Sequence, residues 1–217
     1  MKDKYLIIGQ LYDFLCIIYS FNQIDKCKTA MHDRIKPDSK ILFAGVGHGR
    51  DAIAAAELGA EVTVVDLSET MLKKLNKGIA KKKEFKHPIR QLHKNILHVD
   101  EFSTYDMVFA NFFLNLFSKE RLEQVLNHLI KHTKKGGFVV IGDWVFPRGN
   151  MIAKFFQILY WRICDVLFWI IANNELHPFY DYQKSMSELG LEIKAVKYFR
   201  VLFDDRYCSI LGQKKSS

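Results

Sequence analysis

A glycine-rich segment is the first feature of this sequence that could do chemistry. Gly45, Gly47 and Gly49 stand between a short apolar run and a helix-forming stretch. Because glycine has no side chain, the backbone N–H groups of such a turn can approach a ligand closely, and the next helix begins with unpaired N–H groups. In a dinucleotide fingerprint the third glycine follows the second by three residues, whereas here it follows by two. The spacing favours a different ligand.

A carboxylate closes the next apolar run. Asp66 ends the β-branched stretch 61–66. In an open α/β sheet the carboxyl ends of neighbouring strands meet at one crevice, so we expect Asp66 beside the glycines. An ionised carboxylate there accepts hydrogen bonds from both hydroxyls of a ribose, each worth about 1.5 to 3 kcal/mol. The pair predicts a site for an adenosine-like ligand. The alternative, that Asp66 only caps a helix, leaves the glycines unexplained.

Alternating strands and helices are predicted to position these residues. The pattern indicates helices at about residues 5–19 and 25–35, a strand at 40–44, a helix at 51–59, a strand at 61–66 and a helix opening after Ser68. Further strands are predicted at 88–92, 107–110 and 137–142, with a helix at 119–131. This alternation is typical of a parallel, doubly wound α/β sheet covered on both faces.

The end of the chain departs from that alternation. Residues 191–203 and 207–211 are rich in β-forming types, and Asp204 and Asp205 interrupt them. Two strands joined by a short turn pair antiparallel, so the sheet is predicted to end in a hairpin. At 217 residues the chain fits a single domain, 1–217, with residues 1–36 as a helical cover.

Composition limits the classes of protein to consider. The chain is 49% hydrophobic and 26% charged, as an ordinary folded protein is. Four cysteines without a C-x-x-C pair, and eight histidines without convincing ligand spacing, predict a reduced, cytoplasmic protein with no metal site. Part of the net charge of +8 comes from lysines between positions 73 and 86, which we interpret as a solvated face. An acidic partner is the alternative.

Residues 41–72 resemble the cofactor-binding half of class I S-adenosylmethionine-dependent methyltransferases, the family that includes ubiquinone and menaquinone biosynthesis enzymes. The resemblance implies a Rossmann-like, mostly parallel seven-stranded sheet ending in an antiparallel hairpin, and S-adenosyl-L-methionine as cofactor. By the same resemblance the glycine segment packs against the methionine and ribose of the cofactor, Asp66 holds the ribose hydroxyls, and Leu67 lies against adenine.

The sequence also departs from this family. Members commonly carry an acid two positions before the first glycine, where this chain has Phe43. The string 47–51 is reminiscent of the thiopurine methyltransferase branch, which also lacks that acid; Asp51 is therefore a candidate substitute, with helix capping as its alternative role. Asn95, after the third strand, is a candidate adenine contact. Asn111 lies in a segment, 110–115, that resembles the border of the transferred methyl group.

Candidate catalytic groups are few. Asp143 stands at the tip of the fifth strand, and His177 and Tyr180 follow an apolar stretch. Methyl transfer depends mainly on holding acceptor and methyl group in register, so a base is needed only if the acceptor must lose a proton. We favour His177 as that base, because the unperturbed histidine pKa of about 6.5 is close to neutral pH. A structural role in the turn before Pro178 is an equal alternative.

Residues 150–172 are almost uniformly apolar and aromatic, interrupted by Lys154, Arg162 and Asp165. Three charges argue against a membrane-spanning helix. We expect an insertion at 148–182 that roofs the substrate pocket; a core helix is the alternative. Such a surface suits a small aromatic or isoprenoid-like ligand, or shallow contact with a bilayer. The expected protein is cytoplasmic, and peripheral to the inner face of a membrane if that contact forms.

The leading hypothesis is therefore a methyltransferase acting on a small, largely apolar, phenolic or quinol-like acceptor. The glycine spacing and the terminal hairpin disfavour an NAD-dependent oxidoreductase. An RNA methyltransferase is the main alternative, although the chain lacks the Asn- or Asp-Pro-Pro-aromatic string of base-amino methyltransferases and a separate RNA-binding module, so we expect no nucleic-acid partner. A non-catalytic module that binds the cofactor to regulate another protein is the third reading.

Overall fold

Seven strands of this chain form one sheet. The computed structural model describes residues 22–82, 84–146, 150–152, 154–159, 161, 179–201 and 204–216. The strands are β1 (Lys40–Ala44), β2 (Glu61–Asp66), β3 (Arg90–His93), β4 (Tyr105–Asn111), β5 (Thr133–Trp144), β6 (Leu191–Val201) and β7 (Asp204–Lys214). Their order across the sheet is β3-β2-β1-β4-β5-β7-β6.

The first five strands pair in parallel, and β7 lies antiparallel between β5 and β6. This confirms the predicted mostly parallel, seven-stranded sheet with a terminal hairpin. The chain builds outward from β1 to β3 and then returns to place β4 on the other side of β1. Ligands of open α/β sheets bind where the strand order reverses in this way, outside the carboxyl ends of the strands.

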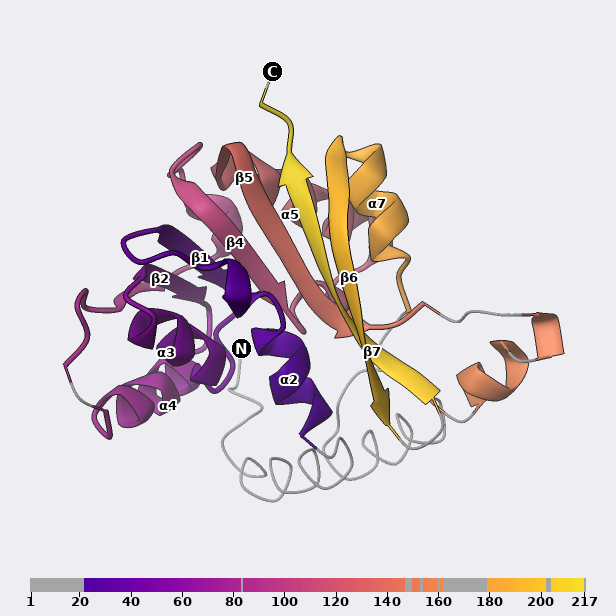
Figure 1. Ribbon diagram of the computed structural model, residues 1–217, viewed down its shortest axis with the longest axis horizontal. Coiled ribbons are helices and arrows are strands. Elements are labelled where there is room, and N and C mark those ends of the chain that lie inside the picture. The colour runs from indigo at the N-terminus through magenta and orange to yellow at the C-terminus, as the bar shows by residue number, and fades with distance from the viewer. Residues whose placement is uncertain are drawn as a thin grey trace.

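Helices cover both faces of the sheet (Figure 1). On one face are α2 (Gln23–Thr29), α3 (Arg50–Glu57) and α4 (Glu69–Ile79). The short helix η1 (His32–Arg34) follows α2 in the chain. On the other face are α5 (Lys119–His132) and α7 (Tyr182–Glu188), with η2 (Ile96–His98) and η3 (Leu114–Leu116). Among the described residues no helix is long and apolar enough to cross a membrane.

The alternation of side chains along a strand separates the core into two layers. Ile41 and Phe43 of β1 pack with the buried residues of α3 and α4. Leu42 and Ala44 pack with those of α5. The short strand β1 is thus buried on both faces, as expected for a central parallel strand.

One expectation about the hairpin was wrong. Asp204 and Asp205 do not interrupt the strands but begin β7, where they pair with Val201 and Arg200 of β6. The charge is compatible with a strand because the Arg200 Nε donates to the Asp205 carboxylate across the pair at 3.4 Å.

Some expectations fall wholly or partly outside the described residues. The helix predicted at 5–19 lies outside them, and in place of the single helix predicted at 25–35 the structure has α2, from Gln23 to Thr29, followed by η1. Of the insertion expected at 148–182, only 150–152, 154–159, 161 and 179–182 are described. The division of the single domain into cover, core and insertion stays a prediction.

Candidate functional site

The glycine segment leaves the carboxyl end of β1 in a conformation that favours glycine. Gly45, Gly47 and Gly49 have φ values of +73°, +49° and +71°. A Cβ on Gly45 would lie 2.5 Å from Cδ2 of Phe113, and one on Gly49 would lie 2.4 Å from Cδ1 of Leu75. Two of the glycines are thus required by close packing as well as by backbone conformation.

Asp66 ties the glycine segment to β2. One carboxylate oxygen accepts the Val46 N–H at 2.8 Å, and the other accepts the Ser68 N–H at 2.7 Å. Ser68, rather than Asp66, is the N-cap of α4, because its hydroxyl accepts the Met71 N–H. Each carboxylate oxygen has a second lone pair, so the half-buried Asp66 can still accept bonds from a ligand.

An exposed apolar side chain lies next to Asp66. Leu67 is 62% exposed although it directly follows a buried strand, and its carbonyl oxygen lies 3.0 Å from Nε2 of His93. Asn95 is half-buried at the start of η2, where its Oδ1 accepts the Leu97 N–H at 3.0 Å. That bond caps η2 and leaves the amide NH₂ as the part of Asn95 suited to a ligand.

Asp51 and Asn111 meet in the interior beside the glycine segment. The Asn111 Nδ2 donates to the Asp51 carboxylate at 2.9 Å and to the Lys28 carbonyl at 3.1 Å. Both side chains are buried, and Asn111 Oδ1 has no hydrogen-bond partner among the described residues. The capping role considered for Asp51 is not observed, because Gly49 is the N-cap of α3 and makes no side-chain bond.

Lys28, on α2, is a site residue that sequence reasoning missed. A Cβ on Gly47 would meet its Nζ at 3.6 Å, and the same Nζ stands 5.8 Å from the centre of the Phe112 ring. Lys28 and Asp51 line a cavity of about 480 Å³ between α2 and the start of α3. No spacing in the sequence links α2 to the glycine segment, so only the fold reveals this contact.

Phe43 occupies the position where the resembling family carries an acid. Its side chain is buried and stacks on Phe109 with 4.8 Å between ring centres. His32 lies edge-on to Phe109, and burial lowers the pKa of His32. This strand position therefore contributes to the core, and any group that contacts a ligand's ammonium must come from another element.

Asp143 lies at the same edge of the sheet, one strand further along. One of its oxygens accepts the Trp144 N–H at 2.8 Å, and the other accepts the hydroxyl of Tyr182 at 2.9 Å. Asp143 is fully buried, and burial raises its pKa to about 7. Burial, and then the charge of Asp143, raise the pKa of Tyr182 well above its ordinary value. Sequence reasoning did not select Tyr182.

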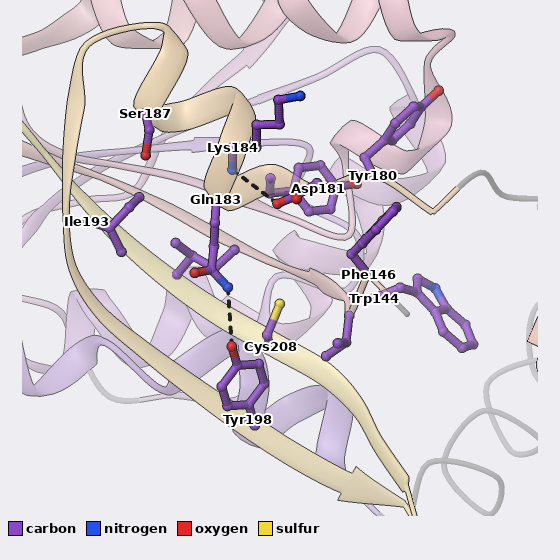
Figure 2. Close-up of a pocket in the computed structure, with 13 residues that line it drawn as sticks. Trp144, Phe146, Tyr180, Asp181, Gln183, Lys184, Ser187, Ile193, Tyr198 and Cys208 are labelled. Carbon is purple, nitrogen blue, oxygen red and sulfur yellow. Dashed lines mark hydrogen bonds between the residues drawn. The ribbon is translucent and has the colours of Figure 1, made fainter. Parts of the chain in front are cut away.

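A second cavity, of about 350 Å³, adjoins this pair. Figure 2 shows its aromatic lining from β5, the segment before α7, and β6. Tyr180 contributes to this lining, and its hydroxyl donates to the Phe117 carbonyl at 2.8 Å. His177 lies outside the described residues. The aromatic residues of the cavity are Trp144, Phe146, Tyr180, Tyr182 and Tyr198.

The end of β4 connects the residues around the glycine segment with the buried pair Asp143 and Tyr182. Asn111 pairs with Gly142, the residue before Asp143, and the Phe112 N–H donates to the Gly142 carbonyl at 2.7 Å. Phe112 has a φ of +51°, a conformation that costs energy for a bulky residue and occurs most often at functional sites. Its ring contacts Tyr207 edge-on. The predicted segment 110–115 therefore borders both the glycine segment and the Asp143–Tyr182 pair.

A family model described as a methyltransferase domain matches residues 41–137, from β1 into β5. A curated relative, the ribosomal protein L11 methyltransferase of Desulfitobacterium hafniense, is 43% identical over 47 residues. Those residues are 22% of this chain and 15% of that relative, so the match spans less than a fifth of the relative's length.

Two solved structures share the fold over nearly the whole chain. The 1,6-didemethyltoxoflavin-N1-methyltransferase of Burkholderia thailandensis, with bound 1,6-didemethyltoxoflavin and S-adenosylhomocysteine, is 14% identical with a TM-score of 0.70, covering 98% of this chain and 87% of that one. The magnesium protoporphyrin IX methyltransferase of Synechocystis PCC 6803, with bound SAH, is 15% identical with a TM-score of 0.69, covering 91% and 84%.

Proposed function

We propose that this chain, whose residues 41–137 match a methyltransferase domain, is a class I S-adenosylmethionine-dependent methyltransferase that methylates a small, largely apolar acceptor. The observation that carries this proposal is the geometry of Asp66 and the glycine segment. A carboxylate with free lone pairs, a side-chain-free turn and an exposed leucine meet where the strand order reverses.

The residues around the glycine segment and Asp66 fit S-adenosylmethionine. The glycine segment leaves room for the ligand at Gly47, where, of the residues that the structure describes, only Lys28 has an atom within 4 Å of an added Cβ. Asp66 would accept the two ribose hydroxyls, and Leu67 would cover one face of adenine. The Asn95 amide would bond the edge of the same ring. When bound, the cofactor supplies an electrophilic methyl group on a sulfonium centre.

The methionine end would be held by groups that replace the missing strand acid. The Asp51 carboxylate, which accepts the Asn111 amide at 2.9 Å, would be the acceptor for the ammonium group. Lys28 Nζ, beside Gly47, has the charge to bind the carboxylate of the same amino acid.

Replacing Lys28 with methionine tests this placement. We expect about tenfold weaker binding of S-adenosylmethionine, because one charge-assisted hydrogen bond is lost while an unbranched side chain only one atom shorter is kept. Isothermal titration calorimetry measures the change. Lys36→Met is the matched control on an exposed loop and should bind normally. Equal affinities for the two variants would mean that another group holds the cofactor carboxylate.

The acceptor would lie against the aromatic cavity at the end of β5. Its aromatic walls suit a planar, largely apolar molecule such as a phenol or quinol. The two structural neighbours described above are named for small-molecule acceptors, 1,6-didemethyltoxoflavin and magnesium protoporphyrin IX. Asp143 orients the Tyr182 ring in that wall through a buried hydrogen bond. Tyr180 is proposed as an acceptor contact, and His177 as the base for an acceptor that loses a proton.

The proton on Asp143 predicts how stability changes with pH. Its folded pKa of about 7 exceeds the ordinary aspartate value of 3.8, so the folded state binds this proton more tightly than the unfolded chain does. The stabilisation is complete below about pH 4 and is lost as the pH rises to about 7. The melting temperature should therefore fall as the pH rises from about 4 to about 7, and in Asp143→Asn this fall should be smaller by at least a few degrees. Asp100→Asn, at an exposed position, is the control, and an unchanged slope in Asp143→Asn would contradict the assignment.

The test of the function is calorimetry with S-adenosylmethionine and S-adenosylhomocysteine, with NADH titrated in parallel, followed by methyl-transfer assays on phenols and quinols. Micromolar binding of the two sulfur compounds and methylation of a phenol or quinol are expected. Binding of NADH alone would exclude the proposal. Methylation of RNA instead, with binding that weakens steeply in salt, would replace the acceptor class.

A further inference from the structure

Asp143 and Tyr182 place a buried carboxylate behind the aromatic cavity. Asp143 is fully buried, and one of its oxygens accepts the Tyr182 hydroxyl at 2.9 Å. Tyr182 belongs to the lining of the cavity, whereas Asp143 does not. A molecule in the cavity is therefore connected to the carboxylate through Tyr182, without touching the carboxylate itself.

The strand pairing turns Asp143 toward this cavity. Asp143 lies opposite Cys208 in the antiparallel pair of β5 and β7, and the side chains of directly opposite residues share one face of the sheet. Cys208 lines the cavity, and Figure 2 shows its sulfur atom among the other lining side chains. The carboxylate thus lies on the cavity side of β5, next to β4, whose end reaches the glycine segment.

Burial enables this carboxylate to take up a proton near neutral pH. It raises the pKa of Asp143 to about 7, although the Trp144 N–H and the Tyr182 hydroxyl both stabilise the ionised form. The pKa of Tyr182 is raised well above its ordinary value, so the tyrosine keeps a proton of its own and can pass one on. A base is most effective when its pKa is close to the working pH. Among the described residues, the other charged or titratable side chains that act on the pair are Lys28, Cys27 and Cys208.

Resting on the proposed methyl transfer, we propose that Tyr182 and Asp143 form a proton relay for a methyl acceptor that reacts at a hydroxyl group. The acceptor oxygen forms a bond to the methyl carbon while the carbon–sulfur bond breaks, and the electron pair of that bond stays on sulfur. The hydroxyl proton passes to the Tyr182 oxygen, the Tyr182 proton passes to Asp143, and Asp143 later releases it to solvent. For such an acceptor the relay is the alternative to His177 as the base.

The first test needs neither cofactor nor turnover. In carbon NMR of the full chain, the Asp143 carboxyl group should titrate at about pH 7. Tyr182→Phe should raise that midpoint, because the ionised carboxylate loses a hydrogen-bond donor. A midpoint at the ordinary value of 3.8, or one that Tyr182→Phe leaves unchanged, would overturn the relay.

The second test measures methyl transfer from S-adenosylmethionine to hydroquinone. In the unchanged protein kcat should rise as the pH passes about 7, because the relay needs ionised Asp143. Tyr182→Phe and Asp143→Asn should each lower kcat at least tenfold and leave the affinity for S-adenosylhomocysteine unchanged. Tyr182→Phe keeps the aromatic ring, so it tests the relay even if Asp143→Asn does not fold.

Tyr105→Phe is the matched control, because Tyr105 is also a buried tyrosine whose hydroxyl donates to a carboxylate, that of Glu101, at the start of β4. It should keep kcat and its pH dependence. Normal kcat in Tyr182→Phe, or a rise with pH that only His177→Gln removes, would overturn the relay. Binding of S-adenosylhomocysteine without methylation of hydroquinone would overturn the relay alone, whereas binding of neither sulfur compound would overturn the proposed function as well.

Discussion

Asp66→Ala is expected to weaken binding of S-adenosylmethionine at least tenfold in a protein that still folds. Two charge-assisted hydrogen bonds to the ribose are lost, each worth about 1.5 to 3 kcal/mol, and a tenfold change corresponds to about 1.4 kcal/mol. The Val46 and Ser68 N–H groups also lose their acceptor, so the glycine segment is no longer held to β2. Isothermal titration calorimetry gives the affinity, and a thermal melt gives the stability.

Asp106→Ala separates loss of the ligand contact from general damage to the sheet. Asp106 lies at the opposite end of the sheet, near the start of β4, where it accepts the Lys40 N–H at 2.8 Å and the Lys134 ammonium at 2.7 Å. Like Asp66, Asp106 therefore holds the backbone of another segment, here the start of β1, but it does so far from the glycines. This variant should lose stability and keep its affinity. Unchanged affinity in folded Asp66→Ala would refute the placement of the ribose.

Gly45→Ala is expected to lower the free energy of unfolding by about 2 to 4 kcal/mol. The left-handed φ of +73° costs alanine about 1 kcal/mol, and the new Cβ would overlap the Phe113 ring, which adds about 1 to 3 kcal/mol. In a chain of this length the melting temperature should fall by roughly 5 to 15 °C. Cofactor affinity should fall with it, because moving Phe113 disturbs the segment 110–115, which we propose borders the methyl group.

Gly190→Ala is the control for the backbone contribution. Gly190 has a φ of +85°, but a Cβ there meets no atom of the described part of the chain within 4 Å. This variant should lose only the strain of about 1 kcal/mol, with unchanged cofactor binding. Equal losses in the two variants would show that the contact with Phe113 is not what makes Gly45 necessary.

The sequence by itself determined the first strands of the sheet and the glycine turn between them. Strands β1 and β2 were predicted at their observed bounds, because short apolar runs ended by glycine or aspartate have few other stable conformations in a sheet covered on both faces. Gly45 and Asp66 were predicted to lie together because parallel strands end at one edge. These inferences need only local chemistry and the rule that links strand direction to the binding crevice.

Tertiary structure decided which distant side chains complete the site. Lys28 reaches the glycine segment, Asn111 bonds Asp51, and Tyr182 bonds the buried Asp143. Each contact joins elements far apart in the sequence, and no periodicity encodes which helix covers which strand end. Burial has the same origin: an aspartate at a strand tip is normally ionised, and only packing from several elements raises the pKa of Asp143 to about 7.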